Sequence, residues 1–128
     1  MGNGTSIGKV RGLGSAHHGA HHWLLARTTA ISNLVLMSWL LVSFLLLNDF
    51  SYSTVSTWLS KPIAAVPMIL LIISVFYHAR LGLQVLIEDY VEDSGSKFGL
   101  LSALNLLAFG AGGFAVFSVA SLALTGAA

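Results

Sequence analysis

The chain has 128 residues, of which 55% are hydrophobic and only 9% are charged. Soluble domains carry about 25% charged residues, so a surface of this composition is expected to face a lipid bilayer rather than water. The formal net charge of +1 provides no basic patch for the phosphates of nucleic acid. The absence of cysteine excludes disulfides and cysteine-ligated zinc or iron–sulfur sites on this chain, so any iron–sulfur chemistry must belong to a partner.

Residues 1–23 form an N-terminal segment that is rich in glycine and serine, carries Lys9 and Arg11, and ends at Trp23. No short apolar region follows the two basic residues before a small-residue cleavage site, as it would in a secretory signal peptide. We therefore expect a segment outside the bilayer, with Trp23 as an anchor at the membrane interface.

Four histidines near the end of this segment suggest a zinc site: His17, His18, His21 and His22. On a helix they form two pairs separated by four residues, which is a known two-ligand spacing. Gly19 interrupts the segment, and no acidic residue lies nearby in the sequence. The alternative is an interfacial segment that contacts a partner or lipid headgroups.

Three long apolar runs follow, and each is predicted to be a transmembrane helix: residues 24–47, 62–88 and 98–124. At about 1.5 Å per residue, each exceeds the hydrocarbon core of about 30 Å. Residues 48–61 form a polar outer loop, residues 89–97 an acidic inner loop, and residues 125–128 a C-terminal tail. The predicted fold class is an all-α membrane protein with three transmembrane helices.

Glycines interrupt the middle of the third run, at Gly110, Gly112 and Gly113. Small residues let a neighbouring helix approach closely in a membrane. We favour this interpretation over a phosphate-binding loop, because the run is apolar and does not follow a strand.

Basic residues predict the orientation of the three runs. Most of them lie on the N-terminal side or in the loop on that same side: Lys9, Arg11, Arg27 and Lys97. Lys61 lies alone on the other side, and the C-terminal tail has no charged side chain. The positive-inside rule then places the N-terminus and the 89–97 loop in the cytoplasm of a bacterium, or in the matrix if the protein is mitochondrial.

His78 lies deep in the second run, and an ionisable residue at such a depth is a functional candidate by default. It either packs against a neighbouring helix or polar cavity, or it is an axial ligand of a haem iron, for which a neutral imidazole is well suited. Ser74 and Gly82 are small and share its helix face, which fits either a porphyrin edge or close helix packing. No other histidine lies in a predicted span, so a bis-histidine haem requires its second ligand from another subunit.

Tyr90 and Asp89 lie where the second run meets water, about 18 Å along a helix from His78. They are either a residue of the aromatic belt beside a solvated acid, or part of a quinone site. A quinone head in an apolar pocket needs hydrogen-bond donors for its carbonyl oxygens, and a tyrosine hydroxyl can donate one.

Two arginines lie in or near the spans. Arg27 is within the first turns of the first span, where it serves as a snorkelling anchor, an ion-pair partner, or a partner of an anionic group. Arg80 is two residues from His78 and so points roughly to the other side of the helix, from where it can extend toward Glu88. The sequence does not assign its role.

Two stretches resemble the small hydrophobic membrane anchor of succinate dehydrogenase (respiratory complex II). One runs from Gly14-Ser15-Ala16 to His21-His22-Trp23-Leu24-Leu25-Ala26-Arg27-Thr28-Thr29-Ala30. The other, more specific, is His78 followed by Gly82 and by Asp89-Tyr90-Val91 at the end of the second span. The first stretch looks more like alphaproteobacterial or mitochondrial-type members of the family than enterobacterial ones.

This resemblance implies that His78 is an axial ligand of haem b, in a helix bundle completed by a second hydrophobic anchor subunit of the cytochrome b type. It implies that Tyr90 contacts ubiquinone, that Asp89 supports the quinone site, and that Arg27 lies near the haem propionates or the quinone. The further implied partners are an iron–sulfur subunit, which this chain docks, and a flavoprotein subunit that oxidises succinate.

The expected function is membrane anchoring in electron transport and the tricarboxylic acid cycle, without catalytic activity of the chain alone. The expected location is the bacterial inner membrane, or the mitochondrial inner membrane with the N-terminus in the matrix. Three alternatives stay open: an anchor of a quinol:fumarate reductase, a cofactor-free three-helix scaffold in which His78 only packs, and a metal-handling membrane protein that uses the N-terminal histidines.

Overall fold

The computed structural model describes residues 19–126, which fold into three long helices and one short one. The long helices are α2 (Gly19–Leu45), α4 (Pro62–Tyr90) and α5 (Ser94–Thr125), and the short helix is α3 (Tyr52–Leu59). Each long helix is long and apolar enough to cross a membrane. No strand occurs within residues 19–126. The prediction of an all-α membrane protein with three membrane-crossing helices is confirmed.

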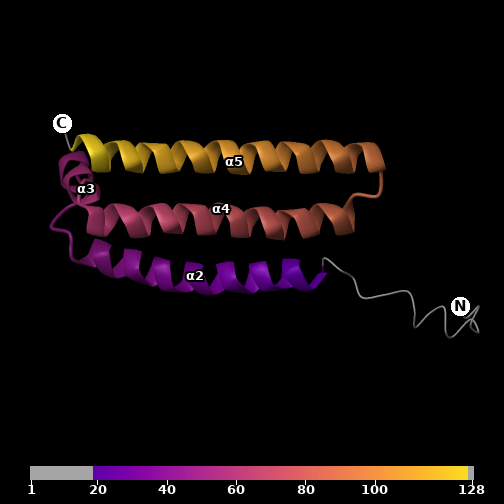
Figure 1. The fold of residues 1–128 in the computed structure, drawn as a ribbon, viewed down its shortest axis with the longest axis horizontal. Coiled ribbons are helices and arrows are strands. Elements are labelled where there is room, and N and C mark those ends of the chain that lie inside the picture. The colour runs from indigo at the N-terminus through magenta and orange to yellow at the C-terminus, as the bar shows by residue number, and fades with distance from the viewer. Residues whose placement is uncertain (1–18, 127–128) are drawn as a thin grey trace, which may run out of the picture.

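The three long helices lie side by side in one layer, with α4 between α2 and α5 (Figure 1). The two outer helices do not contact each other. Helix α4 therefore provides most of the buried side chains of the described chain, including Ala64, Ala65, Leu71 and Leu81. Large apolar side chains on the outer helices stay exposed, such as Leu34 on α2 and Phe117 on α5.

Local residue choices fix where α4 and α5 begin and end. Pro62 occupies the first turn of α4, where its missing N–H leaves no hydrogen bond unmade. The side chain of Asp93 caps α5 by accepting a hydrogen bond from the backbone N–H of Ser96 at 2.7 Å. That hydrogen bond also holds the pKa of Asp93 below its usual value. Helix α5 ends before Gly126, whose φ of 77° lies in the left-handed region.

Helix α3 lies within the segment that the sequence predicts to be a polar loop. Ser51 caps it, and Asp49 accepts hydrogen bonds from the side chain and backbone of Ser51. Hydrogen bonds to its carboxylate, chiefly from the side chain of Ser51, lower the pKa of Asp49. The ring of Trp58 stacks on Trp39 of α2, with 5.8 Å between centroids, and meets Phe44 edge-on at the same distance. This packing explains a helix that is too short to be stable alone.

One of the three glycines in α5 is a packing position. Gly112 is buried against α4, and a methyl group placed there would lie 3.3 Å from Cγ of Phe76. Gly110 and Gly113 have no such neighbour within 4 Å among the described residues. The close approach predicted from the glycines is therefore confirmed at Gly112.

Candidate functional site

His78 lies near the middle of α4 and contacts α2 through a hydrogen bond. Its Nδ1 is 2.9 Å from the hydroxyl oxygen of Thr29. The same hydroxyl donates to backbone carbonyls one turn back in α2, at 2.8 Å to Leu25 and 3.1 Å to Ala26. Because a threonine hydroxyl has a single hydrogen, its oxygen is left to accept a hydrogen bond from His78.

Ser74, one turn before His78, makes a second connection between the same helices. Its hydroxyl is buried and donates to the backbone carbonyl of Thr29 at 3.3 Å. Gly82, one turn after His78, is exposed, and a methyl group placed on it would meet no atom within 4 Å. Helix α2 thus covers the surface of α4 near Ser74, whereas the surface near Gly82 is uncovered among the described residues.

A cavity of about 300 Å³ lies between α2 and α4, next to these contacts. Four of its lining residues carry hydroxyl groups: Thr29, Ser32, Ser74 and Tyr77. The others are the apolar residues Leu36, Leu70 and Ile73. The region beside His78 is therefore apolar with a few hydroxyl donors, a composition typical of small-molecule sites.

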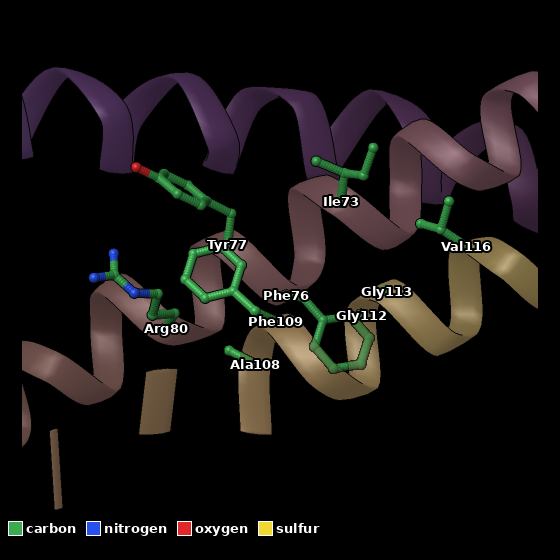
Figure 2. Close-up of a pocket in the computed structure, with 9 residues that line it drawn as sticks. All are labelled: Ile73, Phe76, Tyr77, Arg80, Ala108, Phe109, Gly112, Gly113 and Val116. Atoms are coloured by element: carbon green, nitrogen blue, oxygen red, sulfur yellow. The ribbon is translucent and has the colours of Figure 1, made fainter. Parts of the chain in front are cut away.

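A second cavity, of about 240 Å³, lies between α4 and α5 and shares the lining residues Ile73 and Tyr77 with the first (Figure 2). Arg80 lines it, and its Nε donates a hydrogen bond to the side-chain oxygen of Asn105 on α5. The guanidinium also lies over the rings of Tyr77 and Phe109, 5.9 Å and 5.7 Å from their centroids. Arg80 is thus held between α4 and α5 rather than extended toward Glu88.

Glu88 has other contacts at the end of α4. Its carboxylate accepts a hydrogen bond from Gln84 at 2.8 Å, and its backbone carbonyl accepts one from Lys97 Nζ at 3.0 Å. Lys97 thereby connects the start of α5 to the end of α4. The acidic loop is held in place close to the residues predicted to contact a quinone.

The end of α4 and the start of α2 lie at the same end of the molecule (Figure 1). Tyr90 is the last residue of α4, and 81% of its side chain is exposed; Asp89 is exposed beside it. Arg27 is exposed in α2, with its guanidinium 5.3 Å from the ring centroid of Trp23. No hydrogen bond within residues 19–126 joins the side chains of Arg27, Asp89 and Tyr90. They share one end of the molecule without forming a closed site in this chain.

His21 and His22 lie in the first turn of α2, and His17 and His18 lie outside the described residues. Within residues 19–126, no three side chains of histidine, cysteine, aspartate or glutamate form a group that could hold a metal ion. The zinc hypothesis depends on all four histidines, so it stays a prediction.

Comparison with known proteins identifies the family. Residues 1–112 match the family described as the succinate dehydrogenase/fumarate reductase transmembrane subunit. A succinate dehydrogenase hydrophobic membrane anchor subunit from Rickettsia bellii is 43% identical over 103 residues, covering 80% of this chain and 82% of the relative. Its counterpart from Rickettsia conorii is 37% identical over 89 residues, covering 69% and 71%. The chain belongs to the succinate dehydrogenase membrane anchor family.

Membership in this family confirms the resemblance drawn from the sequence motifs and agrees with the three apolar helices. The protein is an integral membrane protein and the membrane anchor of a succinate dehydrogenase. The family match extends through α2, α4 and about half of α5, so it includes every predicted site residue.

Two residues of this anchor subunit are not predicted as site residues from the sequence. Thr29 belongs to the first family-like stretch without a role of its own, and Asn105 lies in the third apolar run, yet they bind the two ionisable side chains deepest in α4. A polar residue inside an apolar span is the available signal for Asn105. For Thr29 the signal is ambiguous, because Thr28 beside it has the same chemistry.

Proposed function

We propose that this anchor subunit contributes one axial ligand to a haem b through Nε2 of His78, and part of a ubiquinone-reduction site through Tyr90. The observation that carries the haem proposal is the hydrogen bond between His78 and Thr29. It engages Nδ1 and leaves Nε2 with a free lone pair, which is what a metal ligand requires. The open surface at Gly82 also leaves room on this side of α4 for a large planar group.

Haem b bound at this position supplies a one-electron carrier inside the membrane. The described helices offer it one axial ligand, because their other histidines, His21 and His22, lie at the start of α2. The second ligand would come from a second hydrophobic anchor subunit of the cytochrome b type. The exposed apolar faces of the helix layer are suited to such a partner and to lipid.

The proposed quinone site lies at the end of the molecule that Tyr90, Asp89 and Arg27 share. The exposed hydroxyl of Tyr90 donates a hydrogen bond to a quinone carbonyl, and the carboxylate of Asp89 orients that hydroxyl. Arg27 provides a positive charge for haem propionates or for the quinone region. This end docks the iron–sulfur subunit, which closes the pocket, and the flavoprotein subunit supplies electrons from succinate. By the positive-inside rule this end faces the cytoplasm across a bacterial inner membrane.

The test is a reduced-minus-oxidised optical spectrum of the purified complex, with the native chain and with His78→Ala. We expect the b-type band to disappear or to change to a high-spin form in the variant. His22→Ala, which removes a histidine near the start of α2, is the control and should keep the native band. An unchanged band in His78→Ala would show that the haem is held elsewhere, and the proposal would fail at its central residue.

A further inference from the structure

We propose that Thr29 is a positioning residue for His78. Its hydroxyl oxygen accepts a hydrogen bond from Nδ1–H and so holds the imidazole in the tautomer whose Nε2 binds iron. The inference rests on the proposed function, because it specifies how this chain prepares the ligand that the haem would use. It assigns a task to a residue of α2 that lies 49 positions before His78 in the sequence.

The direction of the hydrogen bond follows from counting protons. The hydroxyl of Thr29 lies 2.8 Å from the carbonyl oxygen of Leu25 and 3.1 Å from that of Ala26, and it has one hydrogen to donate. A neutral imidazole also carries one N–H, on either nitrogen. With the threonine hydrogen used within α2, the contact of 2.9 Å requires the hydrogen on Nδ1 of His78.

A hydrogen bond in the opposite direction, from Thr29 to His78, is less favourable. If Thr29 donated to Nδ1, it would give up its hydrogen bonds to the backbone carbonyls of α2, in a region where water does not replace them. The imidazole hydrogen would then sit on Nε2, and that nitrogen would have no lone pair for a metal. The observed contacts therefore favour the tautomer that is competent to bind iron.

A second contact fixes the position of the acceptor. The backbone carbonyl of Thr29 accepts a hydrogen bond from Ser74 at 3.3 Å, and Ser74 lies one turn before His78 on α4. Two hydrogen bonds thus join the same turns of α2 and α4, one through the side-chain hydroxyl of Thr29 and one through its backbone carbonyl. An acceptor held on a helix backbone limits rotation of the imidazole ring as well as setting its tautomer.

Thr28 provides a matched control on the same helix. Its hydroxyl donates to the carbonyl of Leu24 at 2.8 Å, one turn back, as that of Thr29 does to Leu25. It is exposed, and its only hydrogen bond within the described residues is that one. Replacing Thr28 or Thr29 by valine exchanges a hydroxyl group for a methyl group in either case. Only Thr29→Val removes the hydrogen-bond acceptor of His78.

The experiment compares Thr29→Val, Thr29→Ser and Thr28→Val in the whole complex, by the midpoint potential of the haem and by its rate of transfer to an excess of apomyoglobin. Removing a hydrogen-bond partner of a metal-ligating histidine typically weakens metal binding about 10- to 100-fold, so we expect Thr29→Val to speed haem loss by a similar factor. The potential should rise, because an imidazole without its acceptor is less basic and stabilises the ferric state less. Thr29→Ser and Thr28→Val should match the native complex.

Two outcomes overturn the inference while leaving the proposed function intact. In the first, Thr29→Val matches Thr28→Val in both potential and rate of haem loss. In the second, Thr29→Ser, which keeps the hydroxyl, changes as much as Thr29→Val, which would assign the effect to altered side-chain packing rather than to loss of the acceptor. Should Thr29→Val fail to assemble, Thr29→Ala removes the same acceptor without adding bulk. A low-spin haem that persists in His78→Ala would instead overturn the proposed function itself.

Discussion

The hydroxyl of Tyr90 is the single group on which the quinone proposal depends most. Tyr90→Phe should lower quinone reduction at limiting ubiquinone about fivefold, because the net value of one hydrogen bond is about 1 kcal/mol. Tyr52→Phe is a matched control, since Tyr52 is 80% exposed but lies on α3, which Figure 1 shows at the opposite end of the molecule. Succinate oxidation with a soluble dye, which bypasses the quinone, should stay unchanged in both variants. Native quinone reduction in Tyr90→Phe would contradict the role of its hydroxyl.

At the same scale, His78 and Thr29 show what the sequence predicts and what it does not. His78 can be identified from the sequence alone, because an imidazole deep in an apolar run is rare whatever it contacts. Thr28 and Thr29 are adjacent, so they point about 100° apart on a helix, and only one can face α4. Which one does so depends on how α2 is rotated against α4, and this is a property of packing. The pairing of Arg80 with Asn105 is a further case, since it requires the register of α4 against α5.

Helix packing at Gly112 gives a prediction at the scale of the elements. Gly112→Ala should weaken contact between α4 and α5, because the added methyl group meets Phe76 at 3.3 Å. Gly110→Ala is the control: no atom lies within 4 Å of its added methyl group, and alanine favours a helix by up to about 1 kcal/mol over glycine. The thermal midpoint of the complex in detergent should fall for Gly112→Ala and stay level or rise for Gly110→Ala. Equal midpoints would show that Phe76 moves aside at no cost.

The elements differ in how far their sequences determine them. The three long helices follow from long apolar runs, because a helix satisfies the backbone hydrogen bonds of such a run within the run itself inside a bilayer. The sequence does not predict helix α3, because four of its eight residues are serine or threonine and its stability depends on partners distant in sequence. Its cap at Ser51 is local, but the stacking of Trp58 on Trp39 needs α2 to lie beside it. Short helices of this kind depend on tertiary contacts that a sequence pattern does not reveal.

For the whole molecule, the flat layer of α2, α4 and α5 explains why the site is incomplete. A layer one helix thick buries few side chains, and both of its faces keep large apolar residues exposed, such as Leu107 at 70%. These faces must meet lipid or other subunits. The surface of α4 next to His78 is uncovered at Gly82, and the side chain of Tyr90 is exposed at one end of the molecule. The proposed haem and quinone sites therefore both require surfaces from partner chains.

This incompleteness predicts the behaviour of the chain without its partners. Expressed alone, it should still insert into the membrane, because α2, α4 and α5 each satisfy their backbone hydrogen bonds internally. It should show no low-spin b-type spectrum, because the proposed ligand His78 would supply only one of the two axial positions of the haem iron. Adding free imidazole with haem should produce the low-spin spectrum in the native chain, through the vacant second position, and should not do so in His78→Ala at the same concentration. A low-spin spectrum from the monomeric native chain without imidazole would mean that this chain holds both ligands, and the shared haem would have to be abandoned.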